Sequence, residues 1–398
     1  MARRIATLGA LLLLLSACAA PPPTATGTPS PTHDPTALNV TAFLDLSGGR
    51  LPGGDAQRNA LQLWVDLQQG RPAAPRLKLR IVDVAGSDAR LFIELHRIAT
   101  EDLADAIVIG VPVALDDTLL RAIELTARPV LFTVPHAEPS GRGGGGRWTF
   151  SLAPTPAQIA TVDHSLVPAG PLPGAVSAII VSDESPAAVR ERTALQAEFA
   201  ARGGAAPTVL RIQAGERDRF PARLRPALAV RVALYFAGPT GSYLAPVRLL
   251  PSPTATTGFV TVLSFLTDAA DLGQLRESAS VTRWPGTRNI VTGPVDPTAA
   301  GGAARAAFAR AYGDRHGPPT TLAALAYDTL GIIAAAGQAG SDPARLRDRI
   351  ESGTFAGIAT SYAFTPFRHA AFDTGDLVLL AWDGTHPVLA PPAFAIPK

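Results

Sequence analysis

Residues 38–83, LNVTAFLDLSGGRLPGGDAQRNALQLWVDLQQGRPAAPRLKLRIVD, contain the pattern that indicates the fold class most directly. It begins and ends with short β-rich runs, 38–44 and 77–83. Between them, the segment 55–69 carries apolar residues at helical spacing, namely Leu61, Trp64 and Leu67. Two strands joined by one helix of this length predict a βαβ unit with parallel strands.

The same alternation continues along the rest of the chain. Further strands are expected at 106–109, 129–134, 148–152, 175–181, 208–212, 229–236 and 258–264. Helices are expected at 89–103 and 116–126, and a third is capped by Ser185, started by Pro186 and ended by Gly203. A Pro/Gly-rich break at 168–174 divides the series in two, which predicts two α/β lobes. Ligands of such sheets bind beyond the carboxyl ends of the strands, so two facing lobes would form a cleft.

The N-terminus has the pattern of an export signal. Residues 1–17 combine Arg3 and Arg4, a short leucine-rich stretch and small residues before Cys18. Leu15-Ser16-Ala17-Cys18 resembles the lipobox of bacterial lipoproteins, in which the cysteine thiol is acylated; the alternative is an ordinary secretory signal with an accidental cysteine. Residues 18–37 are then the lipidated Cys18 and a Pro/Thr-rich tether.

Composition excludes several classes of protein. The chain has 398 residues, 47% hydrophobic and 17% charged, enough for two domains with cores of their own. Its 35 basic and 33 acidic side chains become 33 of each once 1–17 are removed, which argues against nucleic-acid binding. Cys18 is the only cysteine, so an intrachain disulfide and a cysteine metal site are impossible. No later apolar run approaches the roughly 20 residues that cross a bilayer.

Enzyme signatures are missing from the sequence. It contains no GxSxG, no P-loop GKS or GKT, and no HExxH. Residues 141–146 formally match GxGxxG but precede a strand instead of opening a helix, so they indicate a loop. His136-Ala137-Glu138 matches half of a deaminase zinc motif, and the PCxxC half is absent. The prediction is a protein without catalytic activity, cofactor or metal.

The order of these features resembles the type I periplasmic binding proteins, in particular the leucine/isoleucine/valine-binding branch of substrate-binding lipoproteins of ABC importers. The first-half residues that carry the resemblance are Gly48-Gly49, Gly53-Gly54, Ala60, Asp83, Gly110, Ala153-Pro154 and Gln158. Those of the second half are Asp183, Asp218-Arg219-Phe220, 308–313, Ala326-Tyr327-Asp328, Thr354-Phe355-Ala356-Gly357 and Trp382-Asp383-Gly384.

The resemblance implies an α/β fold of two doubly wound, Rossmann-like lobes, joined by three crossovers and closing on a ligand in the interlobe cleft. Lobe 1 would comprise 38–156 and 290–374. Lobe 2 would comprise 157–289 and 375–398.

The resemblance also places candidate ligand-binding residues on the loops that face the cleft. In lobe 1 these are Ser47, Val113, Ala114, His136, Ala137 and Glu138. In lobe 2 they are Glu184, Ser185, Pro239, Thr240, Thr267 and Asp268. Amino-acid binders of this branch hold the carboxylate with Ser or Thr hydroxyls, whereas 111–115 contain none, which argues against a plain branched-chain amino acid. Glu138 or Asp268 would suit a cationic group.

Two functions of different classes follow. The first is a monomeric, lipid-anchored receptor of the bacterial envelope, facing the periplasm or the cell exterior, that delivers a small polar solute to an ABC permease by cleft closure. The alternative is a regulatory or scaffolding lipoprotein of the same fold that binds a protein partner and has lost small-molecule binding.

Overall fold

The computed structural model describes most of the chain after residue 32. The described residues are 33–48, 53–69, 75–136, 146–165, 177–212, 220–224, 232–238, 247, 259–267, 282–289, 301–337, 342–382 and 387–390. The predicted export signal 1–17, Cys18 and residues 19–32 of the predicted tether lie outside them.

The first sheet, sheet A, is entirely parallel and has the strand order β2-β1-β3-β4-β5. Its strands are β1 (Leu38–Leu44), β2 (Leu77–Asp83), β3 (Ala106–Ile109), β4 (Val130–Phe132) and β5 (Thr149–Ser151). The connecting helices are α2 (Gly54–Gln68), α3 (Asp88–Glu101) and α4 (Asp117–Thr126). The βαβ unit predicted from 38–83 is therefore confirmed, with Val40 of β1 beside Leu79 of β2.

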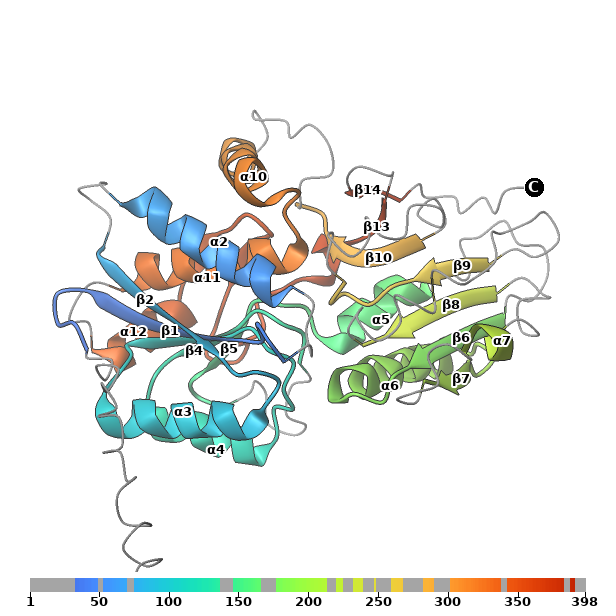
Figure 1. The fold of residues 1–398 in the computed structure, drawn as a ribbon, viewed down its shortest axis with the longest axis horizontal. Coiled ribbons are helices and arrows are strands. Elements are labelled where there is room, and N and C mark those ends of the chain that lie inside the picture. Colours follow the sequence, from blue (N-terminus) through green and yellow to red (C-terminus); the bar gives the residue numbers. More distant parts are fainter. Residues whose placement is uncertain are drawn as a thin grey trace, which may run out of the picture. The chain divides into compact units, whose positions relative to one another are not determined.

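Sheet A is buried on both faces, which explains why its strands are almost continuously apolar. Alternate residues of β1, Val40 and Ala42 among them, pack toward α2 and α11 (Thr321–Ala336). Phe43 points the other way and packs against α3 and α4. Figure 1 shows the same layering, with α2 and α11 on one face of the sheet and α3 and α4 on the other.

Sheet B contains seven strands in the order β14-β13-β10-β9-β8-β6-β7. They are β6 (Ser177–Ser182), β7 (Thr208–Arg211), β8 (Val232–Ala237), β9 (Phe259–Val262), β10 (Thr282–Thr287), β13 (Leu377–Trp382) and β14 (Pro387–Leu389). The first five are parallel to one another. From the end of the chain, β13 adds antiparallel to β10, and β14 adds antiparallel to β13. Its helices are α5 (Pro156–His164), α6 (Pro186–Ala201) and α7 (Phe220–Leu224).

Local signals for the helix starts are confirmed. Ser185 caps α6 by accepting a hydrogen bond from the Ala188 N–H, and Pro186 occupies the first helical turn. Asp116 caps α4 in the same way through the Leu119 N–H. The acid pair 116–117 therefore starts a helix.

The remaining elements, between β10 and β13, are α10 (Gly302–His316), α11, α12 (Pro343–Glu351), β11 (Thr354–Ala356), β12 (Ser361–Ala363) and the 3-10 turn η5 (Thr374–Asp376). Asp328 of α11 holds the hairpin of β11 and β12, because its carboxylate accepts hydrogen bonds from the Ile358 and Ala359 N–H groups and from the Tyr362 hydroxyl. Burial raises the pKa of Asp328 to about 7, against these three hydrogen bonds, which lower it.

None of the described helices is by itself long and apolar enough to cross a membrane. Only α10 and α11 taken together reach the required length and composition, and they are bent by 119° at their junction. Most of α11 is buried in the core of the protein.

Candidate functional site

Each sheet has one point at which the strand order reverses. In sheet A it lies between β1 and β3, and in sheet B between β6 and β8. The loops that leave neighbouring strands there turn to opposite faces of the sheet and leave a crevice at the carboxyl edge, where ligands of open α/β sheets bind. These two carboxyl edges are therefore the candidate site.

At the edge of sheet A, Asp83 at the end of β2 organises the loop that follows β1. Its carboxylate accepts hydrogen bonds from the Leu46 and Ala85 N–H groups and from the Ser47 hydroxyl, the last at 2.5 Å. Burial opposes ionisation of Asp83, but the hydrogen bonds outweigh it and lower its pKa to about 2. The hydroxyl of Ser47, a candidate ligand group, is thus already bound to the protein.

Gln57 of α2 ties the ends of β3 and β4 together. It is fully buried, its Nε2 donates to the Gly110 carbonyl oxygen at 2.9 Å, and its Oε1 accepts from the Thr133 hydroxyl at 2.6 Å. A Cβ atom on Gly110 would lie 2.4 Å from Gln57 Oε1, so this position requires glycine. We call Gln57 the lobe 1 clamp.

The other lobe 1 candidates are divided between core and surface. Val113 is buried in the apolar cluster between sheet A and α3–α4, whereas Ala114 is exposed. His136 is buried, and its ring centroid lies 4.5 Å from that of Phe132. Ala137 and Glu138 lie outside the described residues. Among the described lobe 1 candidates, Ser47 and Ala114 are exposed, and the Ser47 hydroxyl is hydrogen-bonded to Asp83.

At the edge of sheet B, Glu184 and Ser185 follow β6, and Thr267 follows β9. Glu184 has a left-handed backbone, with φ of 61°, and its carboxylate is paired with Arg192 and Arg211. Ser185 is occupied as the α6 cap. Thr267 is buried, and its N–H donates to the Ser264 carbonyl oxygen at 3.0 Å. Pro239, Thr240 and Asp268 lie outside the described residues.

Glu191 of α6 occupies in sheet B the place that Gln57 has in sheet A. One carboxylate oxygen accepts from the Gly238 N–H at 2.7 Å, after β8, and the other from the Ser264 hydroxyl at 2.6 Å, after β9. Burial raises the pKa of Glu191 to about 7, although both hydrogen bonds lower it. We call Glu191 the lobe 2 clamp.

The chemistry of the partners explains why one clamp is an amide and the other an acid. Gln57 faces one acceptor and one donor, the Gly110 carbonyl and the Thr133 hydroxyl, which an amide satisfies with its NH2 and its oxygen. Glu191 faces two donors, which a carboxylate satisfies with its two oxygens. Neither clamp stands out in the sequence, since a single Gln or Glu within a helix carries no motif; only the topology shows their equivalence.

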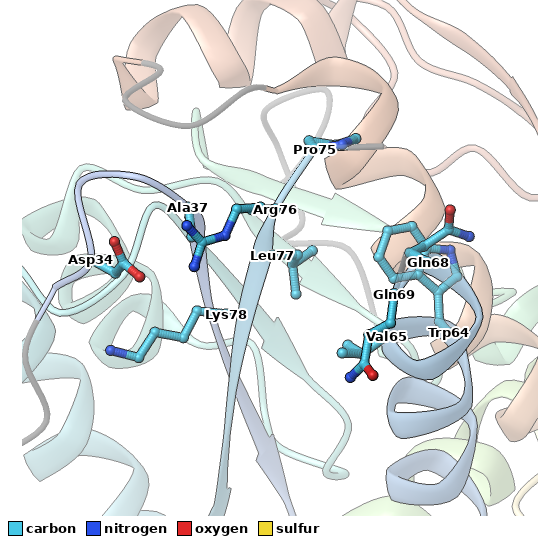
Figure 2. Close-up of a pocket in the computed structure, with 10 residues that line it drawn as sticks. All are labelled: Asp34, Ala37, Trp64, Val65, Gln68, Gln69, Pro75, Arg76, Leu77 and Lys78. Atoms are coloured by element: carbon cyan, nitrogen blue, oxygen red, sulfur yellow. The ribbon is translucent and has the colours of Figure 1, made fainter. Parts of the chain in front are cut away.

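Two cavities lie away from these carboxyl edges. One, of about 430 Å³, surrounds the start of β2 and the end of α2, at the opposite edge of sheet A from the switch point. Figure 2 shows Trp64 and Val65 on the same side of β2 as Leu77, with Lys78 pointing to the other side. The other hollow, of about 800 Å³, runs between α2, α10, α11 and β11 and is lined mainly by small and apolar residues.

A metal site finds no support in the described part of the chain. There, no three His, Cys, Asp or Glu side chains lie close enough together to hold an ion.

The fold matches solved structures of binding proteins over almost their entire length. The branched-chain amino acid transporter substrate-binding protein LivJ of Streptococcus pneumoniae, in complex with isoleucine, matches with a TM-score of 0.69 and 16% identity, covering 89% of this chain and 99% of its own. A solute-binding protein of an ABC transporter from R. palustris, in complex with benzoate, gives 0.70 and 18%, covering 89% and 95%. A type 1 periplasmic binding protein from Bordetella pertussis gives 0.66 and 18%, covering 90% and 100%.

No protein-family model matches the chain, and no curated protein sequence does either. The structural matches show that the chain has the type I periplasmic binding protein fold, with two α/β lobes, and the fold predicted from the sequence is confirmed.

Proposed function

We propose that the protein is a solute-binding protein, without catalytic activity, that captures a small polar solute between the carboxyl edges of its two sheets. One observation carries the proposal: each edge has a clamp, Gln57 or Glu191, from the helix that follows the first strand of its sheet. Each clamp fixes the loops after the third and fourth strands of that sheet. Such fixed loops present backbone groups to a ligand at little entropic cost. The structural neighbours that hold isoleucine and benzoate also support the capture of a small solute.

Delivery to an ABC importer completes this proposal. The LivJ neighbour belongs to a branched-chain amino acid transporter, and the R. palustris neighbour to an ABC transporter. A permease that binds the closed form more tightly than the open form would accept only the loaded protein.

A second function, binding of a protein partner without a solute, is favoured by one observation. Side chains expected to face a ligand in lobe 1 are committed elsewhere: the Ser47 hydroxyl is bound to Asp83, and Val113 is packed into the core. Without these hydroxyls, a carboxylate at this edge would have to be held by other donors, such as backbone N–H groups.

The experiment that separates the two functions is a thermal-shift screen of the full-length chain in mild detergent. The library contains isoleucine and other amino acids, benzoate and other short acids, amides, polyamines and nucleosides. A solute that binds only the folded state stabilises it by roughly 2.7 kcal/mol at a hundredfold excess over its Kd, and the melting temperature rises. A hit supports capture of a solute, and a well-folded protein that responds to none refutes it in favour of a protein partner.

Variants then locate the solute. Glu138→Gln and Asp268→Asn test the two acids proposed to hold a cationic group. Glu101→Gln is the matched control, because it also removes one acid but lies at the end of α3, at the opposite, amino edge of sheet A. Loss of the shift in either test variant, with the control unchanged, would identify the anchor.

Lipidation of Cys18 and a place in the cell envelope are part of the proposal and rest on the sequence around Leu15–Cys18. Metabolic labelling with a radioactive fatty acid should label the wild-type chain and leave Cys18→Ser unlabelled. Equal labelling of both, or of neither, would contradict the anchor without touching the solute-binding proposal.

A further inference from the structure

The lobe 2 clamp joins two loops that carry solute candidates. Gly238, bonded to one oxygen of Glu191, directly precedes Pro239 and Thr240. Ser264, bonded to the other oxygen, accepts from the Leu266 N–H and lies three residues before Thr267. One carboxylate therefore sets the starting position of both loops.

Glu191 lies beside a second acid. Asp163 of α5, Tyr235 of β8 and Ser264 line, together with Glu191, a cavity of about 20 Å³, enough for one water molecule. Asp163 Oδ1 is buried and has no hydrogen-bond partner among the described residues. Burial, reinforced by the charge of Glu191, raises the pKa of Asp163 well above its usual range.

Other charges reach Glu191 from the elements around it. Arg190, its neighbour on α6, favours the carboxylate, and Asp183, in the loop after β6, opposes it. The charge of Asp88, at the start of α3, in turn favours the cationic form of Arg190. Tyr235 remains a neutral hydroxyl, because burial raises its pKa well above the usual range.

We propose that Glu191 is a proton-binding positioning residue, whose ionised carboxylate holds the two lobe 2 loops in their ligand-binding arrangement and whose protonation loosens them. The effect on solute binding rests on the proposed function; the proton binding itself does not. Protonation removes the charge that makes both hydrogen bonds strong, and it leaves the Gly238 N–H, which cannot reverse its role, with a weaker acceptor.

The direction in pH follows from the raised pKa of about 7. Above it, the carboxylate is ionised, both loops are held, and a solute finds an ordered site. Below it, the clamp is neutral, the loops must be ordered on binding, and affinity falls.

The Gly238 amide reports the state of the clamp without any solute. The full-length chain is labelled with 13C-carbonyl alanine and 15N glycine, which selects glycines preceded by alanine, Gly238 among them. Its amide signal is followed by NMR from pH 5 to pH 9 in wild type, in the isosteric Glu191→Gln and in Asp163→Asn. Gly337, also preceded by alanine and bonded to the Ile333 carbonyl, is the internal reference.

The expected result is a shift of the Gly238 signal with a midpoint near pH 7 in wild type and Asp163→Asn, absent in Glu191→Gln and at Gly337. No shift in wild type, or a shift that persists in Glu191→Gln, overturns the proposal. Loss of the shift only in Asp163→Asn also overturns it, because Asp163 would then be the titrating group. If Glu191→Gln fails to fold, the wild-type and Asp163→Asn titrations still decide. None of these outcomes depends on finding a solute.

Discussion

Replacing Gln57 by Glu tests the hydrogen-bond polarity of the lobe 1 clamp. The introduced carboxyl would occupy a fully buried place facing the Gly110 carbonyl oxygen, which only accepts, and the Thr133 hydroxyl. An ionised carboxylate there would meet the carbonyl without a proton between them and would carry a buried, unpaired charge. The folded state therefore selects the protonated acid, whose O–H can donate to Gly110.

The magnitude follows from the free energy of holding that proton. An unfolded Glu has a pKa of about 4.3, and each pH unit above it costs about 1.4 kcal/mol when the folded state keeps the acid protonated. Gln57→Glu should thus lower the free energy of unfolding by about 4.5 kcal/mol at about pH 7.5 and by about 1.7 kcal/mol at about pH 5.5. Because the introduced carboxyl has a higher pKa in the folded than in the unfolded state, the variant loses stability as pH rises.

Urea unfolding followed by tryptophan fluorescence, at several pH values between 5 and 8, measures this difference against wild type. Gln57→Ala is the control, because it loses both hydrogen bonds of Gln57 without introducing a titrating group, and its loss of stability should be equal at every pH. A Gln57→Glu penalty that does not change with pH would refute the assignment of Gly110 as an acceptor facing a buried side chain.

Three further changes have simpler outcomes. Asp83→Asn should remove part of the acid sensitivity of folding: the lowered pKa of about 2 gives wild type stability that is present above about pH 4 and is lost as pH falls toward 2, so the unfolding midpoint of the variant should vary less in that range. Tyr362→Phe removes a donor to the buried Asp328 carboxylate and should cost about 1–3 kcal/mol in denaturant unfolding; no loss would mean that the hydrogen bond contributes nothing. Ser185→Ala removes the α6 cap and should cost about 1 kcal/mol, whereas Ser185→Asp should retain most of it, and equal losses would argue against capping.

Most of the fold could be predicted because its signals are local. The strand at 106–109 was expected at the residues where β3 lies, and the α6 start follows from Ser185 and Pro186. Strand ends were less predictable: 129–134 was expected, and β4 covers only Val130–Phe132, although the Thr133 N–H still donates to the Ile109 carbonyl oxygen at the end of β3. The antiparallel strands β13 and β14 were not expected, and Pro387–Leu389 in particular is too short to show a period.

The site was less predictable because its determinants are contacts between distant elements. Ser47 and Ser185 are residues of a type that binds ligands, yet one is held by Asp83 and the other by a helix end, and no property of a serine in sequence distinguishes these roles. The clamps show the converse. Gln57 lies 53 and 76 residues from its two partners, and Glu191 lies 47 and 73 from its own, so only the folded topology brings them together.

The difference between the clamps has a consequence that separates the two lobes. An amide side chain does not change its charge near neutral pH, so we expect the Gln57 hydrogen bonds to hold the lobe 1 loops at every pH at which the protein is folded. A carboxylate between two donors is fixed only while it is ionised, and its pKa of about 7 places the change within the physiological range. Any pH dependence of solute binding that arises from the clamps should therefore come from lobe 2, and Glu191→Gln should remove it while Gln57→Ala leaves it in place.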